Sequence, residues 1–133
     1  MAIIGLFDRT TDLLQKNLDL RMQNQEAISA NIANVDTPGY RAVHLEFEKG
    51  LQHALATEEA KDAAGTAGGG DDITQVQAKV VRLPDYTGIG DHNGVNLDQE
   101  MVDLAQNQVL YDAATELISK KLGLLRYVIQ EGK

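Results

Sequence analysis

Apolar side chains recur at alternating spacings of four and three residues in two long stretches, one near each end of the chain. A repeat of this kind, sustained over several heptads, predicts a helix that packs in a coiled-coil-like manner. In the C-terminal stretch eight of the ten positions are apolar: Leu97, Met101, Leu104, Gln108, Tyr111, Thr115, Ile118, Leu122, Leu125 and Ile129. We therefore expect one helix over residues 97–130, about 50 Å long at roughly 1.5 Å per residue.

The predicted C-terminal helix has a marked beginning and a second apolar stripe. Asn96 is a good N-cap, and Gln99 stands at the capping-box position. Acidic residues dominate the first half, whereas basic residues lie towards the end, which suits the helix dipole. The stripe is widened, so that the helix can meet more than one neighbour, by Leu110, Ala114, Leu117, Leu124 and Val128.

The N-terminal stretch follows the same spacing but is more polar. We expect a helix from about Asp8 to about Asn34, with Arg21 and Gln25 interrupting the apolar seam in its middle. The positions of the seam are Ile4, Phe7, Thr11, Leu14, Leu18, Arg21, Gln25, Ile28, Ile32 and Val35.

Both predicted helices are much longer than the average of about 11–12 residues, and each needs long partners. One helix pair within a single chain leaves half of each apolar stripe in water. We therefore predict that other chains complete the stripes. The residues expected to pack in the helix pair and at subunit interfaces are Leu14, Leu18, Ile28, Ile32, Leu104, Tyr111, Ile118, Leu122 and Leu125.

The region between the helices has a different character. Val43, Leu45 and Phe47 alternate with polar residues as in a short strand, and residues 50–61 could form a short helix. Residues 58–72 contain no apolar side chain larger than Ala and predict a flexible, Gly-rich loop. Residues 73–83 resemble a strand, and residues 84–94 are rich in turn formers.

The predicted fold is therefore mainly α: long N- and C-terminal helices form a coiled-coil-like pair, joined by a middle region with short strands and a flexible Gly-rich loop. We divide the chain into an N-terminal helix and turn (1–40), an extended middle region (41–94) and a C-terminal helix (95–133).

Composition and charge exclude several functions. The chain has 133 residues, a net charge of −8 and no cysteine, so disulfides and thiol chemistry are excluded. The negative charge is spread over all three segments, which argues against a nucleic-acid-binding surface. The apolar run at residues 2–7 is too short for a secretory signal, and no stretch approaches the length of a membrane span. We expect a soluble protein without a cleaved signal.

A search for catalytic or metal-binding motifs finds none that holds. His44, His53 and His92 lie far apart without metal-ligand spacing, and the glycines at 68–70 lack the Lys-Ser/Thr of a phosphate loop. A calcium loop counted from Asp91 fails at its required Gly and Glu positions. We therefore expect no enzyme activity, metal, cofactor or small-molecule substrate.

The segment SANIANVDTPGY, residues 29–40, ends the N-terminal helix and contains the most specific pattern. The residue before a proline is driven from the α region, so Thr37 must leave the helix, and Pro38-Gly39 suits a type II turn in which Gly supplies a positive φ. Termination alone leaves Asn31 and Asn34 unexplained. Their amides could bond the free carbonyls at the helix end or a neighbouring chain's backbone, and could fix register in an apolar seam.

This segment closely resembles the signature of the bacterial flagellar rod and hook family, in which a long helix ends in an asparagine box before Thr-Pro-Gly-Tyr/Phe. The matching residues are Asn31, Ile32, Ala33, Asn34, Thr37, Pro38, Gly39 and Tyr40. The chain is too short for the inserted domain of the distal rod and hook proteins. It is similar in length to the two proximal rod proteins, and residues 91–123 look like the end of one of them.

The resemblance implies a structural subunit of the proximal rod in the flagellar basal body, made in the cytoplasm, exported by the flagellar type III apparatus and assembled into the torque-transmitting shaft across the periplasmic space. Its implied partners are other copies and other proximal and distal rod proteins, the membrane ring, the rod-base adaptor and the export apparatus. The alternative is a soluble cytoplasmic adaptor that binds a partner helix. An enzyme is the third and least favoured class.

Overall fold

The computed structural model describes residues 2–65, 73–83 and 94–132, with side chains for all of these except residues 2–8, 58 and 60–62. Two long helices dominate the fold: α1 spans Ala2–Ala33 and α3 spans Leu97–Glu131. The described part is mainly helical, as the fold class predicted. Between the long helices the chain forms β1 (Val43–Glu46), α2 (Glu48–Ala64), the 3-10 helix η1 (Ile73–Gln75) and β2 (Lys79–Arg82).

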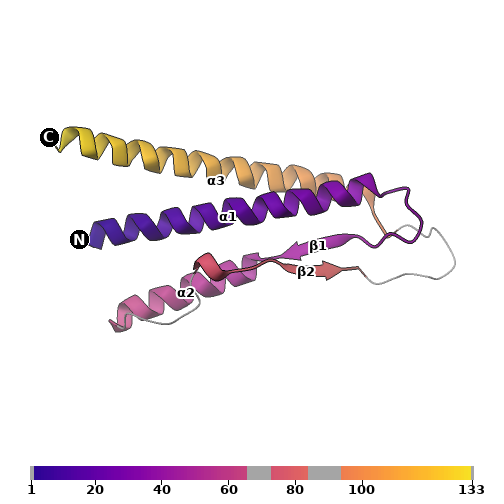
Figure 1. The fold of residues 1–133 in the computed structure, drawn as a ribbon, viewed down its shortest axis with the longest axis horizontal. Helices are drawn as coiled ribbons and strands as arrows, with labels where there is room; N and C mark the ends of the chain where they lie inside the picture. The colour runs from indigo at the N-terminus through magenta and orange to yellow at the C-terminus, as the bar shows by residue number, and fades with distance from the viewer. Residues whose placement is uncertain (1, 66–72, 84–93, 133) are drawn as a thin grey trace.

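The long helices form an antiparallel pair, so that the start of α1 and the end of α3 lie at the same end of the molecule (Figure 1). In the same view α1 lies between α3 and the middle region. The strands β1 and β2 pair antiparallel, with Val43 opposite Arg82 and Glu46 opposite Lys79. The middle region therefore returns along α1, and the turn after α1 brings β1 close to the beginning of α3.

Local chemistry sets both ends of α3. The side chain of Asn96 adopts the predicted N-cap role, since its oxygen accepts a hydrogen bond from the Gln99 N–H at 3.3 Å. Gln99 does not complete a capping box, because its side-chain amide donates to Asp103 at 2.8 Å. At the other end of α3, the Gly132 N–H donates to the Val128 carbonyl at 2.9 Å.

The N-terminal helix begins earlier than the sequence predicted. We expected it from about Asp8, but α1 starts at Ala2. The apolar run at residues 2–7 continues the helix without an intervening cap, and its only weak helix former is Gly5.

The seam between α1 and α3 has a register that the sequence predicted only in part. One expected row of α3 is half-buried as foreseen: Leu104, Tyr111, Ile118 and Leu125. The row beside it consists of Glu100, Asn107, Ala114 and Lys121. The expected second row lies outside the helix pair, since Met101 is 56% and Leu122 is 53% exposed, and its packing between subunits stays a prediction. The seam therefore contains polar and small residues where the periodicity had placed apolar ones.

The middle region also differs from its prediction. Helix α2 is longer than expected and includes residues 58–64, so the first half of the predicted flexible loop is wrong. This stretch is rich in Ala, Glu and Lys, which favour helix. Residues 66–72 and 84–93, where the rest of the loop and most of the predicted turn lie, fall outside the described residues.

The strand predicted over residues 73–83 is confined to Lys79–Arg82. Ile73 instead begins the 3-10 helix η1, which packs against both α1 and α2, and its side chain is 2% exposed. A single large aliphatic residue thus anchors this part of the chain, and its burial prevents the segment from continuing as an extended strand.

Within the described residues, no helix combines the length and apolar character that crossing a membrane requires.

Candidate functional site

Asn31 is completely buried near the C-terminal end of α1, and its amide group makes four hydrogen bonds. The nitrogen Nδ2 donates to the carbonyl of Val43 at 2.9 Å and to Oε2 of Glu100 at 3.1 Å. The oxygen Oδ1 accepts from the N–H of Val43 at 2.9 Å and from the hydroxyl of Tyr40 at 3.4 Å. One side chain therefore ties α1 to the turn, to β1 and to α3. We call Asn31, Tyr40, Val43 and Glu100 the polar junction.

Glu100 supplies the only carboxylate of the polar junction and is 2% exposed. A carboxylate at this depth is costly unless donors surround it. One of its oxygens accepts from Asn31, and the other, Oε1, lies 3.6 Å from Nε2 of His44 on β1. Glu100 thus joins the first turn of α3 to both α1 and β1.

Asn34 has a different role from Asn31, although both belong to the same sequence motif. Its Nδ2 donates to the Ala30 carbonyl at 2.8 Å, and its Oδ1 accepts from the Thr37 hydroxyl at 3.1 Å. The Ala30 carbonyl also accepts from the Asn34 N–H at 3.1 Å, so the Asn34 side chain adds a second bond at the last turn of the helix and links Thr37 to it. Gly39 then takes a φ of 73°, the positive value that the predicted turn requires. Asn34 ends the helix, whereas Asn31 holds the elements together.

A second buried asparagine, Asn107 of α3, meets the polar interruption of α1. Its Nδ2 donates to the carbonyl of Arg21 at 3.0 Å and to Oε1 of Gln25 at 3.1 Å. Its Oδ1 accepts from Nδ2 of Asn24 at 3.1 Å. Asn107 is 3% exposed. Gln25, one of the two residues that interrupt the apolar seam of the N-terminal helix, therefore pairs through its side chain with a polar residue of the other helix, whereas Arg21 contributes its backbone carbonyl.

The two polar contacts between α1 and α3 share one register. Asn31 and Asn24 are seven residues apart on α1, and their partners Glu100 and Asn107 are seven apart on α3. Because the helices are antiparallel, a slip by one residue would separate both pairs at once. Polar residues in an otherwise apolar seam specify register at some cost in stability. The pairs Asn31–Glu100 and Asn24–Asn107 therefore define how α1 and α3 align.

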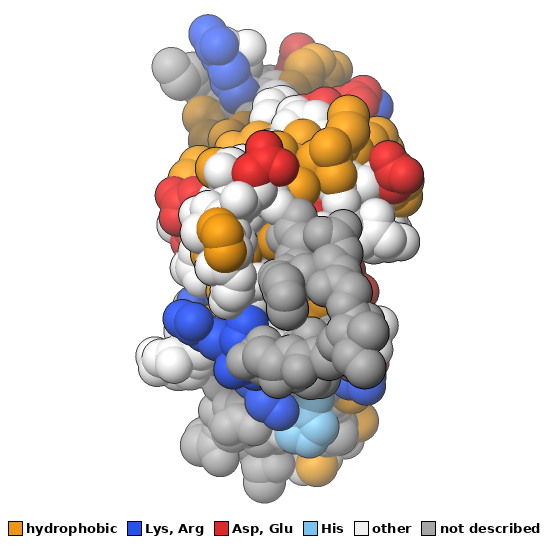
Figure 2. Space-filling model, turned by 90° about the vertical axis from the view of Figure 1, so that its right-hand side faces the viewer, with side chains coloured by type: hydrophobic (Ala, Val, Ile, Leu, Met, Phe, Trp, Pro, Cys, Tyr) orange, Lys and Arg blue, Asp and Glu red, His pale blue; other side chains and the backbone are white. Residues whose placement is uncertain are grey.

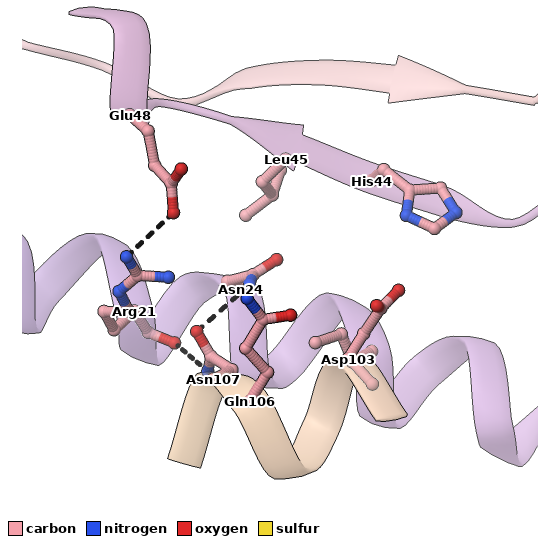
Figure 3. Close-up of a pocket in the computed structure, with 9 residues that line it drawn as sticks. Arg21, Asn24, His44, Leu45, Glu48, Asp103, Gln106 and Asn107 are labelled. Atoms are coloured by element: carbon pink, nitrogen blue, oxygen red, sulfur yellow. Dashed lines mark hydrogen bonds and ion pairs between the residues drawn. The ribbon is translucent and has the colours of Figure 1, made fainter. Parts of the chain in front are cut away.

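An open cavity of about 310 Å³ lies beside these contacts, between α1, α3 and β1 (Figure 3). Nη2 of Arg21 forms a 2.9 Å ion pair with Glu48 at its edge, and the guanidinium lies 5.1 Å from the centre of the Phe47 ring. His44 on β1 and Asp103 on α3 also line the cavity. The lining has no cysteine or serine, and the described residues contain no cluster of three or more potential metal ligands.

Two rows of α3 flank the seam and carry exposed apolar side chains. Row A lies on the side of the cavity and consists of Asp103, Leu110, Leu117 and Leu124. Row B lies on the other side and consists of Met101, Gln108, Thr115, Leu122 and Ile129. The leucines of row A are 36%, 57% and 60% exposed, and Ile129 of row B is 68% exposed. Both rows follow the helix for about 30–40 Å at 1.5 Å per residue.

Figure 2 looks at the end of the molecule where α1 turns into β1, with α3 and α1 in the upper half. Hydrophobic side chains reach the surface there beside Asp and Glu, whereas most Lys and Arg side chains visible in this view lie lower, towards the strands. Exposed apolar rows of this extent mark surfaces that bind other proteins.

The structure brings eight of the nine predicted packing residues into sheltered positions. Ile28 is buried, and seven are half-buried: Leu14, Leu18, Ile32, Leu104, Tyr111, Ile118 and Leu125. Leu122 lies outside the helix pair, in row B. Of the motif residues only Asn31 is fully buried, whereas the side chains of Ala33, Thr37 and Pro38 are exposed.

Sequence reasoning missed the part that Glu100 plays and the contacts of Asn107. It attributed the acidic residues in the first half of the C-terminal helix, Glu100 among them, to the helix dipole, and it gave residues 91–123, which include Asn107, only a family resemblance. One feature of the sequence could have revealed both residues. Glu100 and Asn107 share a seven-residue spacing with Ala114, and this row lies beside the correctly predicted row of Leu104 and Tyr111. It also treated Gly94 as a turn residue, although Gly94 pairs with Arg41 in a parallel bridge next to the junction.

Known proteins resemble this chain over almost its whole length. The family described as "Flagella basal body rod protein" matches residues 18–41. This range includes the asparagine motif and two members of the polar junction, Asn31 and Tyr40. The flagellar basal body rod protein FlgB of Borrelia hermsii is 31% identical, and the match covers 96% of this chain and 100% of the relative. FlgB of Bacillus subtilis is 33% identical, with 98% and 100% covered, and FlgB of Salmonella typhimurium is 33% identical, with 98% and 99% covered.

The family match over residues 18–41, together with relatives that match over nearly the whole chain, shows that this helix pair belongs to a structural protein of the flagellar rod class. Within that class the chain belongs to the FlgB family of flagellar basal body rod proteins. It is a structural subunit of the rod, it is located in the flagellar basal body, and it is not an enzyme. It associates with other basal body proteins, and the alternative of a free cytoplasmic adaptor is not favoured.

Proposed function

We propose that this subunit assembles by sharing the exposed rows of α3 with neighbouring subunits of the rod, so that several chains together bury what one chain leaves in water. The observation that carries the proposal is the exposure of Leu117, Leu122, Leu124 and Ile129, each more than half exposed, along one helix. Burial of an aliphatic side chain contributes about 1.5–3 kcal/mol, so four such residues supply a strong driving force for association.

The polar junction and Asn107 would serve this assembly by holding the subunit in one shape. A shaft that transmits torque needs stiff subunits with defined docking surfaces. The aligned pairs Asn31–Glu100 and Asn24–Asn107 fix the two helices relative to each other, and Val43 couples the middle region to both. Packing through non-identical surfaces on neighbouring subunits generates a ring where the rotation between subunits closes and an open helical assembly where it does not, and a rod requires the second case.

The proposed partners are further copies of this chain, other proximal and distal rod proteins, and the membrane ring and rod-base adaptor at the start of the shaft. We further propose that the flagellar export apparatus delivers the subunit without cleavage of a signal, and that the assembled rod crosses the periplasmic space. Membership of the family supports these proposals, and the exposed apolar rows of α3 support the association with other subunits.

The test is Leu122→Asp. Because Leu122 lies outside the helix pair and is 53% exposed, the variant should keep the helical content and thermal transition of the native protein. We expect it to abolish swimming when it replaces the native chain in cells, because a charge would be buried between subunits. Soft-agar motility and isolation of basal bodies measure the result.

Gln130→Asp is the matched control, since it places the same charge on an exposed polar position of α3. It should leave motility unchanged. Normal swimming and normal rods in the Leu122→Asp strain, with the protein present at native level, would contradict the proposed assembly mechanism.

A further inference from the structure

We infer that the outer edge of β2 is a docking site for an extended, acidic segment of a different protein, which adds to the sheet as a third strand. In Figure 1, β2 lies on the side of β1 away from α1 and α3. The sheet has two strands in the described part of the chain, so β2 has one edge without a strand beside it. This edge is separate from the rows of α3 that the proposed assembly uses.

The ladder between β1 and β2 decides which backbone groups point to this edge. In an antiparallel pair of strands, hydrogen-bonded residue pairs alternate with pairs that are not hydrogen-bonded. Asn31 occupies both backbone groups of Val43, so the pair Val43–Arg82 is of the second kind. The Leu83 N–H donates to the Ala42 carbonyl at 3.0 Å, which agrees with this alternation. The backbone N–H and carbonyl of Arg82 therefore point away from β1.

Val80, two residues before Arg82, has the same backbone orientation. Its partner across the ladder is Leu45, two residues after Val43. Within the described part of the chain, no hydrogen bond reaches the N–H or carbonyl groups of Val80 and Arg82. Unpaired backbone groups at the edge of a sheet are a template for a further strand.

Positive charge at this edge selects which segment can pair there. Arg41, Lys79 and Arg82 are exposed, and none of them forms an ion pair with a described residue. Nε of Arg41 donates to the Leu83 carbonyl at 2.7 Å, which holds the guanidinium at the end of β2 beside Arg82. Glu46 is the only acid of the two strands and lies opposite Lys79, so the sheet keeps an excess of positive charge.

The excess is local, because the whole chain has a net charge of −8. Figure 2 shows most of the visible Lys and Arg side chains on the side of the strands. Charged side chains on an edge strand prevent unspecific pairing. A segment that pairs with β2 therefore has to supply the opposite charge.

The side chains of β2 also define the pattern that such a segment needs. Residues directly opposite each other on neighbouring strands interact through their side chains. The best match has acids opposite Lys79 and Arg82 and apolar side chains opposite the two valines between them. Val80 is 58% exposed and would be covered by this contact. The pattern acid–apolar–apolar–acid reads the same in both directions, so it suits a parallel or an antiparallel strand.

The described strands of a second copy do not offer this pattern. Two copies of β2 aligned side by side would set basic residues against each other in either direction, which is unfavourable. A second copy of β1 cannot pair through Val43, because Asn31 occupies the backbone groups of that residue. The partner that fits is therefore a different chain with an acidic extended segment.

The test measures how a fluorescein-labelled peptide, Thr-Glu-Val-Val-Glu-Thr, binds to the full chain, with fluorescence anisotropy as the signal. We expect a Kd below about 1 mM. Thr-Lys-Val-Val-Lys-Thr should bind at least about tenfold more weakly, because its charge is reversed. The acidic peptide with methyl groups on the backbone nitrogens of both valines keeps its charge but cannot pair as a strand, and it should bind as weakly as the basic peptide. An acidic peptide that binds no more tightly than either control overturns the inference.

Two variants of the chain locate the binding at the edge of β2. Val80→Pro removes an outward N–H and leaves the ladder to β1 intact, since proline is tolerated on the free side of an edge strand. It should weaken binding of the acidic peptide at least about tenfold, whereas Val80→Thr keeps the N–H and should stay within about threefold of the native chain. A Val80→Pro chain with native helical content by circular dichroism and native affinity for the peptide overturns the inference.

The double variant Lys79→Glu with Arg82→Glu decides the matter even if proline disturbs the fold. Both side chains are exposed, so their reversal leaves the packing of the chain unchanged. It should shift the ratio of the two affinities at least about tenfold towards the basic peptide. A double variant that keeps the native preference for the acidic peptide contradicts the inference.

Matched controls separate this edge from general charge effects and from the proposed assembly. Lys49→Glu makes a comparable change of charge at an exposed position of α2 and should bind the acidic peptide within about twofold of the native chain. Leu122→Asp should also bind the peptide like the native chain, so the proposed assembly and this inference can fail separately. In sedimentation velocity, Val80→Pro should self-associate as the native chain does. A loss of self-association in Val80→Pro would assign the edge to a second copy and overturn the inference of a different partner.

Discussion

Replacing Asn31 with Ala is expected to lower the free energy of unfolding by about 3–5 kcal/mol. The change removes four hydrogen bonds and leaves the N–H and carbonyl of Val43 and the carboxylate of Glu100 without their amide partner. Each buried polar group left unsatisfied costs about 1–3 kcal/mol, and a charged group costs more. Urea unfolding followed by circular dichroism measures the loss as a shift of the transition midpoint.

Asn34→Ala is the matched control, because it truncates the same side chain one helical turn away. Its bonds to Ala30 and Thr37 are exposed, so water can replace them, and we expect a loss of about 1 kcal/mol. Adding Glu100→Ala to Asn31→Ala should cost less than the sum of the single changes, since the residues contact each other. Equal losses for the two asparagines, or strict additivity with Glu100→Ala, would contradict a junction centred on Asn31.

Heptad spacing could predict the two long helices because it repeats over many turns and because Asn96 marks where the second one begins. The same spacing could not decide which row completes the seam. Met101 and Leu122 are more apolar than Glu100 and Asn107, so a rule based on hydrophobicity alone places Met101 and Leu122 in the seam. The polar row lies inside because Asn24 and Asn31 across the seam supply matching hydrogen bonds. Partner geometry outweighed apolar character at these positions.

The middle region was harder to predict because its structure depends on contacts with α1. Residues 58–64 have no large apolar side chain, yet good helix formers extend α2 through them. Ile73 lies in a segment that alternates like a strand, but its burial against α1 and α2 directs it into a 3-10 turn. For Ile73 the contacts that decide come from elsewhere in the chain, whereas for residues 58–64 the helix propensity of Ala, Glu and Lys outweighs the lack of large apolar side chains.

The candidate site could be located from sequence more fully on α1 than on α3. The asparagine motif predicted that Asn31 has a role beyond ending the helix, and it does. Its partner Glu100 is 69 residues away in the sequence. Because Glu100 lies in the first turn of a helix, a favourable interaction with the helix dipole already explained an acidic residue there. Pairing over such a distance becomes visible only when the antiparallel register of α1 and α3 is known.

Gly94→Ala is the second change with a large expected effect on stability. A Cβ atom at this position would lie 2.6 Å from the carbonyl oxygen of Tyr40 and 3.4 Å from Cα of Arg41. Both are backbone atoms, so the segment that bridges Gly94 to Arg41 has to move, and Tyr40 carries a hydroxyl bonded to Asn31. Overpacking of this kind costs about 1–3 kcal/mol. We expect a loss near the upper end of that range in urea unfolding, because the shift also disturbs the polar junction.

Gly123→Ala provides a control with the opposite sign. Gly123 lies inside α3, and a Cβ there meets no heavy atom within 4 Å. Ala is favoured over Gly in a helix by about 1 kcal/mol, so this variant should be more stable than the native chain. The two substitutions add the same methyl group, and only the surroundings differ. A Gly94→Ala variant as stable as the native chain, or more stable, would contradict this prediction. The close contact between residue 94 and Tyr40 would then not help to hold the turn after α1 against the beginning of α3.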